Sequence, residues 1–207
     1  MSHKRIVMAI TGASGAPYAV RLLECLTLAG AEVHLVISPY GRRLLADETG
    51  ITSIDAASLV GDRSELLTLY SHQDVGCRLA SGSFLTEGMV ICPCSSNTLG
   101  AIAAGLGDNL ITRAATVTLK EARRLILVPR ETPLSPIEIE NMRTVSRAGG
   151  VICPASPGFY LKPQSVEDLV DFVVGKVLDL LSVPHFLVAR WNSPAGAPEC
   201  AAREPAR

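Results

Sequence analysis

The sequence carries almost no net charge. Its 19 Lys and Arg residues are balanced by 20 Asp and Glu residues, which leaves a formal charge of −1 at pH 7. A protein that binds nucleic acid or an anionic membrane through its overall field needs a positive excess, so neither partner is expected. Apolar residues make up 48% of the chain and charged residues only 19%, a composition that favours a folded domain over a disordered chain.

Long apolar runs are also missing. The longest, such as Ile6–Ile10, cover about a quarter of the roughly 20 residues that a membrane-spanning helix needs. The apolar run near the N-terminus is too short for the core of a signal peptide. The six cysteines are scattered in a chain large enough to fold without disulfides, and only Cys92 and Cys94 lie close together. We therefore expect a cytoplasmic protein with free thiols and no metal site.

What the chain does contain is a series of short apolar stretches, each followed by Gly, Ser or Pro and then by a helical pattern. Because the stretches are continuously apolar rather than alternating, they are typical of parallel strands covered on both faces. The sequence predicts an α/β fold with three α-β-α layers around a Rossmann-like, doubly wound and mostly parallel sheet. The expected strands are Arg5–Ile10, Glu32–Ser38, Met89–Cys92, Leu125–Pro129, Val151–Cys153 and, more weakly, Leu66–Tyr70.

The clearest helical pattern is Val166–Leu181, where apolar residues recur every three or four positions and Ser165 is the expected N-cap. Further helices are predicted over Ala16–Ala29, Pro39–Glu48 and Asn109–Arg124. A length of 207 residues indicates one domain, which we place at residues 1–183. Residues 184–207 are rich in Pro and Ala and lack periodicity, so we expect a partly mobile tail there.

Parallel sheets bind ligands at the carboxyl ends of their strands, so polar loops at those ends form the candidate site. The loop Thr11-Gly12-Ala13-Ser14-Gly15-Ala16 combines two glycines, two hydroxyls and a helix N-terminus with free N–H groups, which suits phosphate or carbonyl oxygens. It matches neither the dinucleotide fingerprint nor the Walker loop. The second strand ends at Ser38 rather than at an acidic residue, so a mononucleotide is favoured over NAD. A tight turn with a serine cap is the alternative.

Polar residues follow two further strands. The run Ser95-Ser96-Asn97-Thr98 follows Met89–Cys92, and it is either a helix cap or a second set of ligand donors. Arg130 and Glu131 follow Leu125–Pro129. Such a pair is commonly a structural ion pair, and it also suits a site that holds a phosphate beside an acid/base group.

Other cations and aromatic residues leave their roles open. Arg113 and Lys120 are seven residues apart, so they project from one face of a helix about 10 Å apart, as a solvated stripe or as anion ligands. Phe159 and Tyr160 end a Pro-rich loop and are equally compatible with packing. The four histidines lack metal-like spacing, and no G-x-S-x-G motif supports hydrolase chemistry.

Taken together, these segments resemble the flavin prenyltransferases, the UbiX-like family of flavoproteins. The similarity runs from Ile6 to about Leu181. It is carried by Thr11–Ala16, Cys92–Ser95, Arg113–Ala115, Leu119–Glu121, Leu127–Pro133, Pro157–Tyr160 and Pro163–Ser165, in that order. The resemblance implies a metal-independent transferase that moves a dimethylallyl group from dimethylallyl monophosphate to N5 and C6 of reduced FMN, giving prenylated FMN.

The resemblance also implies roles for individual residues. The implied FMN contacts are Gly12, Ala13, Ser14, Ser38, Ser95, Ser96, Asn97, Thr98 and Arg130. The implied ligands of the prenyl phosphate are Arg113, Lys120, Tyr160 and Lys176, the last at a position where many relatives carry Arg. The implied catalytic residues are Ser14, Glu48, Glu131 and Lys120. Among these, Ser14 and Glu131 would handle protons around flavin N5 and the released phosphate.

Partners follow from the same resemblance. In this family the site forms between subunits, which implies a homo-oligomer, often a dodecamer. The product serves a separate UbiD-like decarboxylase, in ubiquinone biosynthesis or in aromatic-acid decarboxylation. One alternative is a flavin-dependent decarboxylase of cysteinyl substrates, which has no need of cations around a leaving phosphate. Another is a non-catalytic flavin-binding partner subunit of an aromatic-acid decarboxylase, which the intact acid/base residues disfavour.

Overall fold

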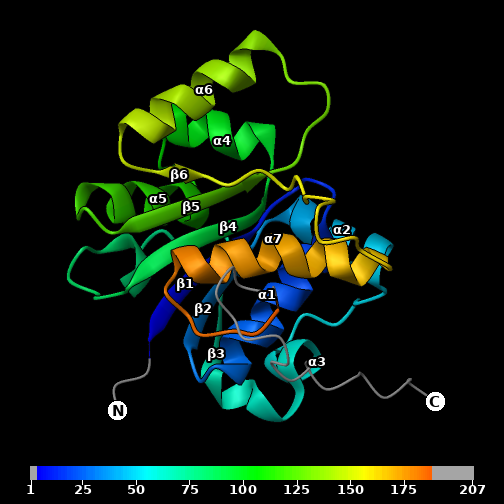
Figure 1. Ribbon diagram of the computed structural model, residues 1–207. Helices are drawn as coiled ribbons and strands as arrows, with labels where there is room; N and C mark the ends of the chain where they lie inside the picture. Colours follow the sequence, from blue (N-terminus) through cyan, green and yellow to red (C-terminus); the bar gives the residue numbers. More distant parts are fainter. Residues whose placement is uncertain (1–3, 188–207) are drawn as a thin grey trace.

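The computed structural model describes residues 4–187 and contains a parallel sheet with the strand order β3-β2-β1-β4-β5-β6 (Figure 1). The predicted doubly wound α/β fold is therefore confirmed, and each observed strand lies within two residues of its predicted bounds. The strands are β1 (Arg5–Ile10), β2 (Glu32–Ile37), β3 (Leu67–Tyr70), β4 (Gly88–Cys94), β5 (Arg124–Pro129) and β6 (Val151–Ile152).

Helices cover both faces of the sheet. Helices α1 and α7 pack together on one face, whereas α4 and α5 lie on the other, and α6 packs on α4 (Figure 1). The α-helices are α1 (Ala16–Leu28), α2 (Pro39–Thr49), α3 (Ala56–Val60), α4 (Ser96–Ala103), α5 (Leu110–Lys120), α6 (Pro136–Arg147) and α7 (Val166–Leu180). Two 3₁₀-helices, η1 (Gly61–Leu66) and η2 (Arg78–Ala80), flank β3.

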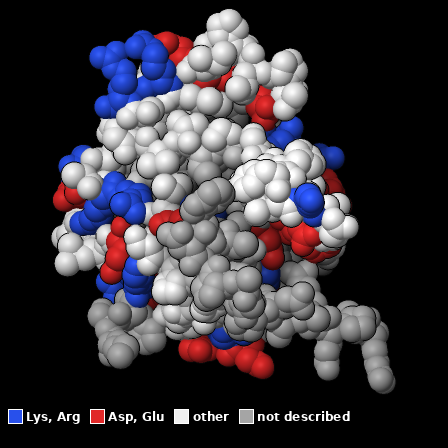
Figure 2. All heavy atoms as spheres, in the orientation of Figure 1, with Lys and Arg blue, Asp and Glu red and all other residues white. Residues whose placement is uncertain are grey.

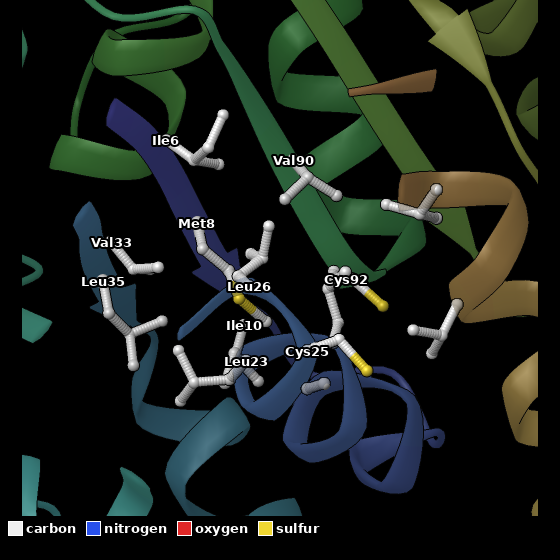
Figure 3. Packing of buried hydrophobic residues seen from close by; sticks show 14 of the residues in the cluster. Ile6, Met8, Ile10, Leu23, Cys25, Leu26, Val33, Leu35, Val90 and Cys92 are labelled. Carbon is white, nitrogen blue, oxygen red and sulfur yellow. The ribbon is translucent and has the colours of Figure 1, made fainter. Parts of the chain in front are cut away.

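Two apolar cores explain why the strands are continuously apolar. Side chains alternate along a strand, so Met8 and Ile10 of β1 point toward α1 and α7, while Val7 and Ala9 point toward α4 and α5. Figure 3 shows Met8 and Ile10 packed against Leu23 and Leu26 of α1, with Val90 and Cys92 of β4 alongside. Both faces of β1 are thus buried.

Polar contacts fix the helices of the α1–α7 layer. The Ser165 hydroxyl accepts from the Asp168 N–H at 3.2 Å, and the Asp168 carboxylate accepts from the Ser165 N–H at 3.2 Å, which forms a capping box at the predicted N-cap. Arg21 of α1 donates to both carboxylate oxygens of Asp171 on α7, at 2.6 and 3.1 Å. This bidentate pair fastens the first helix to the last.

Figure 2 shows basic and acidic side chains near each other in patches toward the edges of the view, around a broad area of other residues. No helix within residues 4–187 is long and apolar enough to cross a bilayer. From residue 188 onward, the predicted tail lies outside the described residues, and the domain boundary at residue 183 stays a prediction.

Candidate active site

A cavity of about 550 Å³, called the main cavity below, opens at the carboxyl edge of the sheet, where β1 and β4 are neighbours. The chain leaves β1 toward β2 and β3 but leaves β4 toward β5 and β6, so a crevice forms between the two loops. The structure brings together predicted residues from four loops here: Gly12 and Ala13 after β1, Ser38 after β2, Ser95–Thr98 after β4, and Arg130 and Glu131 after β5.

Thr11 joins the loops after β1 and β4. Its side chain is buried, and its hydroxyl donates to the Pro93 carbonyl at 2.9 Å and accepts from the Ser95 N–H at 2.8 Å. The expectation that this hydroxyl faces a ligand is therefore wrong. Thr11 instead holds the crevice at a fixed width.

The N-terminus of α1 is occupied by a carboxylate from α2. Glu48 Oε2 accepts from the N–H groups of Gly15 and Ala16 at 2.9 and 2.7 Å, and the carboxylate also bonds the Ser14 side chain. Partial burial raises the pKa of Glu48, but the bonds from Gly15, Ser14 and Ala16 outweigh it, so the pKa is lowered overall. These N–H groups were expected to be free for phosphate, and the structure corrects that: Glu48 takes them.

Gly15 is the N-cap of α1 and has φ = 124°, a conformation that favours glycine. At Gly12, an added Cβ would lie 2.6 Å from Cβ of Tyr40, so a side chain there would push α2 away from the loop. The two glycines let the loop after β1 turn tightly and lie close to α2.

The loop after β4 serves both purposes that the sequence left open. Ser95 is the N-cap of α4: its Oγ accepts from the Thr98 N–H at 3.3 Å and donates to Thr98 Oγ1 at 3.0 Å. Ser96 and Asn97 line the cavity, and their N–H groups belong to the first turn of the helix, which has no intrahelical acceptor. Ser38 likewise caps α2 by accepting from the Gly41 N–H at 3.0 Å.

Arg130 and Glu131 connect neighbouring loops. Arg130 Nε donates to the Ser14 carbonyl at 3.2 Å, and Glu131 Oε2 accepts from Ser96 Oγ at 3.2 Å. Both residues also line a second cavity of about 100 Å³, whose far wall is Pro154, Ala155 and Ser156 after β6. They therefore stand between the main cavity and the loop that leads to Tyr160.

Six further residues line the main cavity that the sequence analysis missed: Pro39, Tyr40, His72, Asp108, Asn109 and Ile111. Burial lowers the pKa of His72, against an opposing effect of Asp108, and its Nδ1 is buried without a partner among the described residues. Asn109 caps α5 by accepting from the N–H groups of Ile111 and Thr112. His72 follows the carboxyl end of β3, and Asn109 immediately precedes α5. The sequence analysis could have included both as candidate site residues from these positions.

The predicted phosphate ligands do not reach this cavity within one chain. Arg113 and Lys120 both lie in α5, as predicted, but the cavity touches the N-terminal end of α5. Lys120 is its last residue, roughly 15 Å away along the axis. It lies beside Gly82, which precedes β4 on the opposite edge of the sheet.

Tyr160 and Lys176 form a separate group around Phe172 of α7. The exposed Tyr160 ring packs edge-on against Phe172 with centroids 5.8 Å apart, and the Lys176 ammonium lies 6.0 Å from the centre of the same ring. The prediction that Arg113, Lys120, Tyr160 and Lys176 share one phosphate therefore stays a prediction, and it requires a second copy of the chain.

The main cavity has the size and donors of a mononucleotide site. Its volume falls within the roughly 300–1,000 Å³ typical of cofactor pockets. Hydroxyl, amide, backbone N–H and guanidinium donors suit a phosphate and the carbonyl oxygens of a flavin ring. No group of three His, Cys, Asp or Glu side chains within residues 4–187 is placed to hold a metal ion. Fold and cavity together define an FMN-binding α/β flavoprotein.

Comparisons with known proteins narrow this class. The family model described as Flavoprotein matches residues 1–178. Flavin prenyltransferase UbiX of Thermoplasma acidophilum is 49% identical over 90% of this chain and 99% of its own length. UbiX of Pseudomonas aeruginosa is 47% identical over 91% and 94%. The chain belongs to the UbiX-like flavin prenyltransferases of the flavoprotein family, as the sequence predicted.

Solved structures agree with this placement. The structure of AnUbiX (PadA1) in complex with FMN and dimethylallyl pyrophosphate superposes with a TM-score of 0.85 at 42% identity, covering 93% of this chain and 99% of that one. A dodecameric FMN-dependent UbiX-like decarboxylase from Escherichia coli O157:H7 gives 0.84 at 42% identity, covering 91% and 100%. The FMN-dependent cysteine decarboxylase TvaF, at 17% identity and a TM-score of 0.58, covering 87% and 99%, shares the fold alone.

Proposed function

We propose that this protein is a flavin prenyltransferase that moves a dimethylallyl group from dimethylallyl monophosphate to N5 and C6 of reduced FMN, without a metal. The observation that carries the proposal is the main cavity, where Arg130 and Glu131 stand beside the donor-rich loop 95–98. Relatives at 49% and 47% identity bear the name of this activity, and a solved relative holds FMN with a dimethylallyl donor.

The residues around the cavity fit FMN. The N–H groups of Ser96 and Asn97 and the terminal nitrogens of Arg130 would hold its anionic and carbonyl oxygens, since Arg130 commits only Nε to Ser14. The remaining FMN contacts that we assign are Gly12, Ala13, Ser14, Ser38, Ser95 and Thr98. Reduced FMN, when bound, supplies the electron-rich nitrogen and carbon that accept the prenyl group.

We assign proton handling to Ser14, Glu48 and Glu131. Glu48 has a lowered pKa and is therefore ionised at neutral pH, so its carboxylate accepts a hydrogen bond from the Ser14 hydroxyl and orients it. Glu131 lies in both cavities, within reach of a group placed between them. We assign to it the proton that moves to or from the released phosphate.

The departing phosphate needs fixed positive charge. Breaking an allylic C–O bond leaves a carbocation and a phosphate dianion, which preorganised cations stabilise. We assign this role to Arg113, Lys120, Tyr160 and Lys176. Because Lys120 lies on the opposite edge of the sheet from its own cavity, it must serve a neighbouring copy. The enzyme is accordingly proposed to be a homo-oligomer, a dodecamer as in the E. coli relative.

An anaerobic assay tests the proposal. Purified protein is mixed with reduced FMN and dimethylallyl monophosphate, and the flavin is analysed by mass spectrometry. We expect a flavin heavier by one five-carbon unit, and we expect this product to activate a separately purified UbiD-like apo-decarboxylase. The proposed role of the protein is to supply that cofactor in the cytoplasm. Decarboxylation of a cysteine-terminated peptide, or FMN recovered unaltered, would contradict the proposal.

A further inference from the structure

Lys120 does not extend freely from the end of α5. Its ammonium lies 2.5 Å from Oε1 of Glu121, and the side chains of the two residues are 51% and 33% exposed. The bond to Lys120 is the main cause of a lowered pKa at Glu121. An ammonium has three N–H donors, so two remain for another anion.

The pair rests on the backbone of Gly82. A Cβ added to Gly82 would overlap the Glu121 carboxylate and lie 3.1 Å from Lys120 Nζ. The absence of a side chain at Gly82 therefore makes the space that both charged groups occupy. Nothing in the backbone requires glycine at this position, because Gly82 is not among the residues with positive φ.

The Gly82 loop is itself fixed to the end of α5. Arg123 donates from Nη2 to the Gly82 carbonyl at 2.5 Å and from Nη1 to the Phe84 carbonyl at 2.8 Å. Within the loop, the hydroxyls of Ser81 and Ser83 bond each other at 2.9 Å. Arg123 therefore fastens the loop against which Lys120 is held.

We propose that Glu121 is a positioning residue for the prenyl transfer: it holds the Lys120 ammonium against Gly82, so that the remaining donors face the phosphate of the prenyl donor bound in a neighbouring copy. This inference rests on the proposed function, because it needs Lys120 to serve that phosphate. An exposed ion pair contributes little to stability. Its value here is that a long, flexible side chain meets its ligand already ordered.

Steady-state kinetics under anaerobic conditions test the proposal with Glu121→Gln and Glu121→Asp. We expect Glu121→Gln to lower kcat/KM for dimethylallyl monophosphate about fivefold, the upper end for an exposed pair, with unchanged FMN affinity and melting temperature. Glu121→Asp keeps a carboxylate and should retain more activity. The control is Glu140→Gln, which removes a carboxylate from a surface ion pair with Arg143 on α6; the Glu140 side chain is 57% exposed, against 33% for Glu121.

A double-mutant cycle tests whether Glu121 acts through Lys120. We expect Lys120→Met/Glu121→Gln to be no slower than Lys120→Met alone, because no ammonium is left to position. Gly82→Ala displaces both groups while keeping their charges and should reproduce the loss. In the control Gly76→Ala, the nearest atom to the new Cβ is at an ordinary 3.6 Å.

The outcomes separate the inference from the function beneath it. A wild-type protein that forms no prenylated flavin overturns the proposed function, and a fully active Lys120→Met overturns its phosphate site. If Lys120→Met is impaired while Glu121→Gln matches Glu140→Gln, the positioning role alone is overturned. Losses that add in the double variant would also overturn it, whether or not Gly82→Ala folds.

Discussion

Arg130 donates through Nε to the backbone carbonyl of Ser14 at 3.2 Å. Arg130 follows β5 and Ser14 follows β1, and β4 lies between these strands. The contact therefore ties the loop after β1 to the loop after β5, on either side of the loop after β4. It also orients the guanidinium, whose terminal nitrogens are left for a ligand.

Replacing Arg130 by Lys should weaken FMN binding about tenfold, because an ammonium cannot donate to Ser14 and present a planar fork to the cofactor at once. Stability should change little. Quenching of flavin fluorescence during titration measures the affinity. Arg143→Lys on the exposed face of α6 is the control, and equal affinities for both variants would contradict the assigned role.

Glu131→Gln should bind FMN normally yet lose at least about a hundredfold in single-turnover rate, because the amide keeps the shape but cannot exchange the proton. Rapid chemical quench under anaerobic conditions measures this rate. Normal product formation would remove Glu131 from the mechanism.

Glu48→Gln should make the free energy of unfolding less dependent on pH in the acidic range. The folded-state pKa of Glu48 is lowered, so the carboxylate stabilises the fold at pH values above its unfolded pKa of about 4.5, and this is lost as pH falls further. We expect the variant to be less stable at pH 7 by about 1 kcal/mol or less, since the group is partly exposed. Urea unfolding at pH 7 and pH 4 measures the difference in free energy of unfolding between the wild type and the variant, and this difference should be smaller at pH 4. A difference that is larger at pH 4 would be inconsistent with this linkage.

Thr11→Val should destabilise the protein by about 2 kcal/mol, because the Ser95 N–H loses its acceptor; the Pro93 carbonyl loses one donor but keeps the Thr11 backbone N–H at 3.2 Å. Thr118→Val is the control: that hydroxyl donates to the Ala114 carbonyl within α5, which the helix already satisfies. Midpoints of urea unfolding compare the two. Equal losses would show that Thr11 does not lock the two loops.

The fold could be predicted because its signals are local. Continuous apolar runs identify strands buried on both faces, and the Ser165 cap with Asp168 lies within one turn of sequence. The carboxyl-edge loops could also be predicted, because parallel strands align their ends. Nothing beyond residue spacing was needed for these features.

The sequence could not show which site residues hydrogen-bond to other parts of the protein rather than to a ligand. The role of Thr11 depends on how closely the loop after β4 approaches, and that of Glu48 depends on where α2 packs against α1. The spacing of Arg113 and Lys120 predicted a shared helix face but left their role open, and only the family resemblance assigned them to the prenyl phosphate. Spacing does not tell which end of a helix reaches the carboxyl edge.

The two ends of α5 have a consequence for mixed populations of chains. Asn109 at its start belongs to the chain's own cavity, whereas Lys120 at its end is assigned to a neighbour. A substitution of Lys120 would then impair the active site of a neighbouring copy rather than that of its own chain. Two inactive variants could therefore complement each other in one assembly. If Lys120→Met and Glu131→Gln chains co-assemble at random in equal amounts, about a quarter of all catalytic centres should be intact, although neither variant is active alone.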